Sequence, residues 1–136
     1  MAMVRKNREN NEEDLDFEVQ FYENILKRKP DFVQALVALG DLYTKKGLHK
    51  EGLAIDQRLE KLRPYNPLVL YNLACSYSLI KDCAKALEAI QKAVACGYHD
   101  FEYLAQDPDL ENLRSDICFQ QYFAEVKNKY LTNDKR

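Results

Sequence analysis

Three features are missing from this sequence: an uninterrupted apolar run long enough to cross a bilayer, a strongly basic patch, and a Cys-x-x-Cys pair. Positive and negative side chains are mixed along the chain and give a formal net charge of -2. Such a balance favours neither a nucleic-acid backbone nor an anionic membrane, so we expect neither as a partner. Residues 1–14 are polar and charged, unlike a signal sequence, and we therefore predict a cytoplasmic protein.

Metal-binding and disulfide patterns are absent as well. The sequence has two histidines, which complete no metal-binding motif, and four cysteines spread without close pairing: Cys75, Cys83, Cys96 and Cys118. Isolated cysteines of this kind are typical of small buried side chains. We predict reduced thiols, no bound metal and no disulfide.

Common catalytic motifs do not occur. The sequence has no Gly-Lys-Ser/Thr phosphate loop, no His-Glu-x-x-His and no Gly-x-Ser-x-Gly. Its many carboxylates are expected on solvated helix faces and not in a catalytic pair. His99 and Asp100 lie in a loop after Gly97, where we expect a helix cap and not a catalytic base. We predict that the protein is not an enzyme and uses no cofactor.

What the sequence does contain is one apolar pattern that occurs twice, 34 residues apart. The matching pairs are Pro30/Pro64, Leu36/Leu70, Leu39/Leu73, Gly40/Ala74, Tyr43/Tyr77 and Leu53/Leu87. A fixed period of this length is typical of helical-repeat arrays, in which each helix pair buries its apolar face by stacking on its neighbours. With 136 residues and 46% hydrophobic residues, the chain is expected to form one all-α domain.

Apolar periodicity and helix breakers predict the order of the helices. Residues 15–21 alternate as in a strand, but the apolar residues from Tyr22 onward keep helical spacing, so we predict a helix over 14–29 that forms half a repeat. Further helices are expected at about 32–46, 49–63, 67–80 and 82–96. Gly47 and Gly97 should supply left-handed turns, and the expected N-terminal caps are Asp31 with Gln34, Asn66 with Pro67, Asp82 and Asp116.

The regular pattern ends after residue 100. A third copy starts at Leu104, but Asp107-Pro108 prevents its helix from continuing. A short turn containing Leu110 and Leu113 follows, and a last helix should cover the end of the stack with Phe119, Tyr122, Phe123, Val126 and Tyr130. The predicted domain spans 14–131, with repeats at about 33–66 and 67–100, capping helices over 101–131, and polar tails at 1–13 (expected to be disordered) and 132–136.

Residues 30–97 resemble two tandem tetratricopeptide repeats (TPRs). The motif positions in the two copies are Leu36, Leu39-Gly40, Tyr43, Gly47, Gly52 and Pro64, and then Leu70, Leu73-Ala74, Tyr77, Ala86, Ile90 and Ala93. In such repeats small residues let helix backbones approach, and tyrosines wedge between helices. The resemblance implies an all-α, TPR-like helix-turn-helix solenoid, a right-handed superhelical stack of antiparallel helix pairs.

The sequence departs from the family pattern at several positions. It contains no tryptophan, Asp56 replaces a hydrophobic residue and Leu59 replaces a small one, so the first copy should pack atypically on its second helix. Residues 107–119 also resemble a stretch that often follows such repeats in bacterial proteins.

The family binds partners on the concave surface formed by the first helix of each pair. The matching positions here are Gln34, Val37, Asp41, Thr44 and Lys45 in the first copy and Leu68, Tyr71, Cys75, Ser78 and Leu79 in the second. We expect Tyr71 to be exposed and to anchor the partner; the alternative is that the last helix packs on Leu68, Tyr71 and Leu79. One TPR subclass binds the C-terminal carboxylate of chaperones in this groove. Asp41 would repel such a carboxylate, so we do not expect this chain to belong to that subclass, although Asn72 matches one of its binding positions.

The resemblance implies an adaptor or scaffold that binds a protein partner, as a peptide or an amphipathic helix, without catalysis. One alternative is a self-assembling structural element in which the helix over 14–29 stacks on a neighbour's terminal helix. Another is a dedicated chaperone for a secreted client. We expect a monomer or a weak homodimer.

Overall fold

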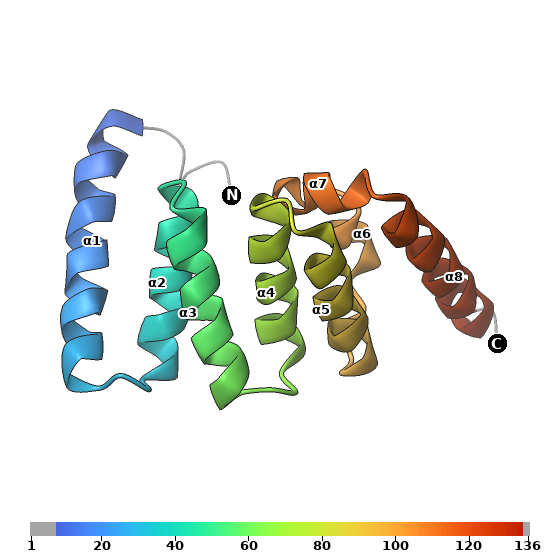
Figure 1. Cartoon of the computed structure of the whole chain (residues 1–136), viewed down its shortest axis with the longest axis horizontal. Helices are drawn as coiled ribbons and strands as arrows, with labels where there is room; N and C mark the ends of the chain where they lie inside the picture. The colour runs from blue at the N-terminus through green and yellow to red at the C-terminus, as the bar shows by residue number, and fades with distance from the viewer. Residues whose placement is uncertain (1–7, 135–136) are drawn as a thin grey trace. The chain divides into compact units, whose positions relative to one another are not determined.

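The computed structural model describes residues 8–134, with side chains described for residues 12–130. Across this range all regular structure is helical, without a strand, as Figure 1 shows. The all-α, TPR-like prediction is therefore confirmed. The elements are α1 Arg8–Arg28, α2 Val33–Lys45, α3 His49–Leu62, α4 Pro67–Leu79, α5 Cys83–Ala95, α6 Phe101–Leu104, the 3-10 helix η2 Pro108–Leu110, α7 Glu111–Arg114 and α8 Ile117–Asp134.

The helices repeat along the chain with the same 34-residue period as the apolar pattern of the sequence. α2 begins at Val33 and α4 at Pro67, and α3 begins at His49 and α5 at Cys83, so both pairs of starting points are 34 residues apart. Residues 15–21 are helical, as predicted. α1 begins earlier than expected and α8 ends later, since helices propagate readily from a packed segment. The remainder of the predicted tails, residues 1–7 and 135–136, lies outside the described residues.

Most of the predicted caps are confirmed. Asn66 Oδ1 accepts hydrogen bonds from the backbone N–H groups of Leu68 and Val69, at 2.9 and 3.1 Å. The carboxylates of Asp82 and Asp116 cap α5 and α8 in the same way. Gly47 and Gly97 have φ angles of +77° and +112°, the left-handed turns that glycine allows.

The predicted cap at Asp31 is wrong. α2 begins at Val33, so the N-cap residue is Phe32, whose side chain makes no capping hydrogen bond. Asp31 precedes the N-cap position by one residue, and Gln34 therefore has no capping box to complete.

The chain forms two compact units, residues 1–62 and 63–136, and each is described by itself. In the first unit α2 packs on both α1 and α3. Its core contains Leu36, Leu39, Ile55 and Leu59, and α1 contributes Val19 and Leu26.

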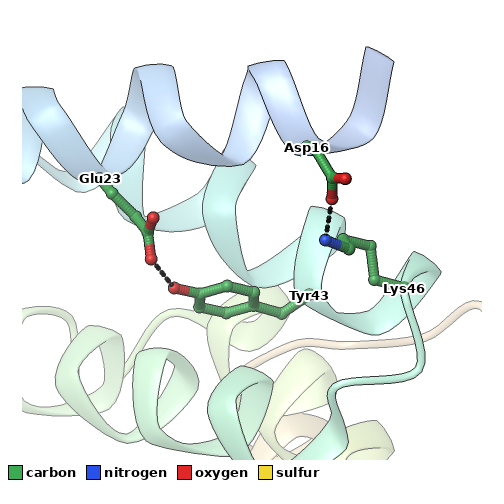
Figure 2. A network of polar contacts seen from close by, with 4 residues as sticks. All are labelled: Asp16, Glu23, Tyr43 and Lys46. Atoms are coloured by element: carbon green, nitrogen blue, oxygen red, sulfur yellow. Dashed lines mark hydrogen bonds and ion pairs between the residues drawn. The ribbon is translucent and has the colours of Figure 1, made fainter. Parts of the chain in front are cut away.

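Two polar contacts hold α1 on α2 (Figure 2). The Tyr43 hydroxyl donates a hydrogen bond of 2.6 Å to Glu23 Oε2, and Lys46 Nζ forms an ion pair with Asp16. Burial, together with the neighbouring Glu23 carboxylate, raises the pKa of Tyr43 to about 12. The phenol is therefore neutral at physiological pH and acts as the donor.

Gly40 and Gly52 mark the close approach of α2 and α3. A Cβ atom at Gly40 would lie 3.3 Å from both Asp56 Oδ1 and Ile55 Cγ2, and one at Gly52 would lie 3.4 Å from Thr44 Oγ1. This backbone contact explains why the first copy has a small residue at both positions.

We predict that Gly40→Leu destabilises the protein by about 1 to 3 kcal/mol, because the added side chain overpacks the α2–α3 contact. Thermal or urea unfolding measures this cost. Ala54→Leu is the matched control, since Ala54 is exposed on α3. Equal stability of Gly40→Leu and Ala54→Leu would contradict the close contact.

In the second unit α4 packs along α5. Leu70, Leu73 and Ala74 of α4 are buried with Ala86, Ile90 and Ala93 of α5. The predicted stripe of α8 packs on the preceding segments: Phe119 is buried, and rings of Phe123 and Tyr130 lie 6.4 and 4.8 Å from that of Phe101 in α6. α8 also contacts α7.

Candidate protein-interaction surfaces

Helix α4 carries no charged residue and is covered on more than one side. α5 covers one part of its surface, and η2 and α7 contact it as well. The chain between α5 and α8 therefore returns to α4 and covers part of the row that the TPR resemblance assigns to a partner. The exposed remainder of α4 is the part that a partner can reach.

Tyr71 is the centre of this covered region. Its hydroxyl donates a hydrogen bond of 2.6 Å to Asp107 Oδ2, and its ring stacks on that of Tyr98 at 4.5 Å with an interplanar angle of 13°. The Cys75 thiol lies 3.7 Å from the same carboxylate oxygen, and Asp107 Oδ1 accepts from the backbone N–H of Asp109. We call Tyr71, Cys75, Tyr98 and Asp107 the Tyr71 cluster.

Burial strengthens the preference of the Tyr71 phenol for the neutral form, which an ordinary tyrosine already adopts at physiological pH. It raises the pKa of Tyr71 strongly, and Cys75 and the hydrogen-bonded Asp107 raise it further. Burial also raises the pKa of Tyr98 to about 12. A neutral Tyr71 hydroxyl supplies the donor that a buried carboxylate requires, so the cluster is satisfied without a ligand.

A second set of hydrogen bonds fixes the far end of α4. Ser78 Oγ accepts from the backbone N–H of Leu113 at 3.1 Å, and the Ser78 carbonyl accepts from Asn112 Nδ2 at 2.9 Å. Arg114 Nη1 donates to the carbonyls of Leu104 and Asp107. Ser78 is fully buried as a result.

The structure therefore corrects the expected exposure of Tyr71. Tyr71 is only 5% exposed, and Cys75 and Ser78 are buried with it. The covering residues come from the segment 98–113 and not from the last helix, which was the alternative. The physical reason is that the interrupted third copy packs its own aromatic and acidic side chains on α4.

The other predicted positions differ in exposure. In α4, Leu68 is 63% exposed and Leu79 is half-buried. In α2, Thr44 is half-buried and donates to the Gly40 carbonyl. The exposed positions of α2 are Gln34, Val37, Asp41 and Lys45, of which the last two form an ion pair of 3.0 Å.

Tyr103 is an exposed aromatic residue that the sequence analysis did not select. The residue is 53% exposed, and its ring lies 6.2 Å from the ring of Tyr71. Leu68 precedes Tyr71 by one helical turn, so these two residues are neighbours on α4. Leu68 and Tyr103 are thus both neighbours of Tyr71, and we call these two residues the Leu68–Tyr103 surface. The only feature of the sequence that could have indicated this surface is the pair of aromatic residues, Phe101 and Tyr103, after the expected cap at Asp100.

A separate apolar surface lies on α1. Phe17 is 73% exposed and Phe21 is 51% exposed, and their spacing of four residues puts them on one face. The contacts from Asp16 and Glu23 to α2 hold this helix in place, as Figure 2 shows. The two phenylalanines thus form a fixed apolar face on the first unit.

The chemistry of the described residues is otherwise plain. No cysteine of the described range forms a disulfide, and Cys118 is exposed, contrary to the expectation that the thiols are buried. Within residues 8–134 no group of three or more His, Cys, Asp or Glu residues is placed to hold a metal ion. Among the helices described, none combines the length and apolar character that spanning a membrane requires.

We predict that Tyr71→Phe destabilises the protein by about 1 to 3 kcal/mol, because the buried Asp107 carboxylate loses a donor. Tyr71→Ala should cost more, about 3 to 5 kcal/mol, since it also leaves a cavity. Urea unfolding measures both costs. Tyr65 is 81% exposed, so Tyr65→Phe is the matched control with little expected effect. A Tyr71→Phe variant as stable as the unchanged protein would show that the hydrogen bond contributes nothing.

Comparison with known proteins supports the helical-repeat architecture. No family model matches the chain. A curated relative, a chloroplastic protein from Arabidopsis thaliana, is 30% identical over 117 residues, which cover 80% of this chain and 34% of the relative. The chain thus spans about a third of that relative, and the cytoplasmic location stays a prediction.

A solved structure extends over more of the chain. MamA 41-end from Desulfovibrio magneticus RS-1, a TPR-containing protein, superimposes with a TM-score of 0.69 at 22% identity, covering 93% of this chain and 70% of that one. At this identity the likeness concerns the fold. The chain therefore has a TPR-like helical-repeat fold.

Proposed function

We propose that this protein is a non-enzymatic protein-interaction module that binds a peptide or an amphipathic helix of a partner. The observation that carries the proposal is Leu68, a leucine that remains 63% exposed on α4 although most of that helix is covered. An exposed apolar side chain next to a rigid, fully hydrogen-bonded cluster offers a preorganised contact to a partner. The TPR-like fold supports the same function class.

The first helix of each pair supplies the proposed contact residues. In the second unit this residue is Leu68 of α4, and we add Tyr103 of α6 because it is exposed. In the first unit they are Val37, which is 43% exposed, and the polar positions Gln34, Asp41 and Lys45. The remaining predicted positions are buried or half-buried, so we leave them out of the proposed contacts: Tyr71, Cys75, Ser78, Thr44 and Leu79.

We predict that a photo-crosslinking amino acid at position 68 captures a defined partner in the source cells. The same amino acid at position 91 is the control, because Gln91 is exposed on α5 in the same unit. With the identified partner, Leu68→Ala should weaken binding by about 1 kcal/mol or more, since an anchoring apolar contact is lost. Crosslinking that is equal at both positions, or binding unchanged by Leu68→Ala, would contradict the proposal.

A second candidate function, self-assembly, is favoured by the exposed face of α1. Phe17 and Phe21 lie on the outer side of a helix that packs on α2 and forms only half of a helix pair. In repeat proteins an unpaired helix of this kind stacks readily on a neighbouring repeat. A second copy of the chain is the simplest occupant.

If self-assembly occurs, the molar mass measured by light scattering should rise with protein concentration. Replacing Phe17 and Phe21 by serine should abolish this rise, because the apolar contact is removed. Leu48→Ser is the control, since Leu48 is 37% exposed on the same unit outside α1. A mass equal to one chain at every concentration would exclude self-assembly.

A further inference from the structure

The negative charge near the Leu68–Tyr103 surface indicates which sign of charge a partner segment should carry. The segment 98–109, which includes Tyr103, contains no Lys or Arg and has four acidic residues: Asp100, Glu102, Asp107 and Asp109. Arg114, further along the chain, donates to the carbonyls of Leu104 and Asp107 and is half-buried, so its guanidinium is turned toward the chain. α4 has no charge to offset this excess. The part of the chain that carries Tyr103 is therefore acidic.

The acidic residues lie close to the exposed tyrosine. Asp100 Oδ1 accepts a hydrogen bond from the backbone N–H of Tyr103 at 3.1 Å. Besides partial burial, the carboxylates of Asp107, Asp109 and Asp100 raise the pKa of the Tyr103 phenol. Asp107 is buried in the Tyr71 cluster, whereas Asp100 and Glu102 are exposed.

A half-exposed tyrosine ring in a negative field suits one kind of side chain in particular. Arginine and lysine interact with the face of an aromatic ring and pair with carboxylates, and arginine can do both with one planar group. Leu68 adds an apolar contact beside the cation. An acidic segment or a terminal carboxylate would instead meet repulsion from Asp100 and Glu102.

We propose that the Leu68–Tyr103 surface binds a basic segment of a partner protein, in which an arginine or lysine lies over Tyr103 and an apolar side chain contacts Leu68. This proposal rests on the proposed interaction function and specifies the partner's chemistry. Charge complementarity selects the occupant. The buried Tyr71 cluster contacts Tyr103 through the ring of Tyr71, which itself stacks on Tyr98.

The test begins with a library of random 12-residue peptides displayed on phage and selected on the full chain. Selected peptides should be enriched in Arg and Lys together with Leu or aromatic residues, and their synthetic forms should bind more weakly as salt increases. Peptides that bind through Leu68 without enrichment of basic residues would overturn the basic-segment proposal while leaving the interaction function intact. Failure to select any peptide would count against both.

Variants then locate the binding. The double variant Asp100→Asn, Asp109→Asn removes two negative charges, and Asn can still cap a helix. Its affinity for a selected basic peptide should be about tenfold lower, and that affinity should depend less on salt. Tyr103→Ala should weaken it to a similar extent. Glu88→Gln, an exposed site on α5, and Tyr65→Ala are the controls and should have no effect. Equal binding by the charge variant and Glu88→Gln would overturn the proposal.

Discussion

The helices of this protein are arranged by one constraint: the first helix of each pair must be covered on more than one side. α2 has buried residues that face both α1 and α3. α4 is even more apolar and is covered by α5 and by the segment that contains η2 and α7. A helix that is apolar around most of its circumference cannot remain at a surface, so the chain before α2 and after α5 must return to cover it.

A tyrosine and a carboxylate fix the covering segment in both units. In the first unit Tyr43 donates to Glu23 of α1, and in the second Tyr71 donates to Asp107. In each case burial raises the pKa of the phenol, which keeps the donor neutral. Each hydrogen bond orients a segment whose apolar contacts alone would tolerate small shifts. The polar contacts therefore add direction to packing that is otherwise hydrophobic.

The covering of α4 also decides which of its residues stay exposed to a partner. The Tyr71 cluster uses the aromatic residue that a TPR-like groove would offer, and it leaves Leu68 and Tyr103 at the surface. Two acidic residues of the covering segment, Asp100 and Glu102, are exposed close to Tyr103 in the chain. The segment that completes the core of the second unit thus also gives the surface of that unit exposed acidic side chains.

The sequence by itself determined the helical class, the 34-residue spacing and most helix ends, because caps, glycine turns and apolar periodicity act over a few residues. It failed at Asp31, where a shift of one residue removes the cap, and at Tyr71, whose register position predicted exposure. Only the tertiary structure decided which α4 residues are accessible, since Tyr71 and Asp107 are separated by 36 positions and meet only when the segment 98–113 folds back. No local pattern encodes that return, because it depends on packing between distant side chains.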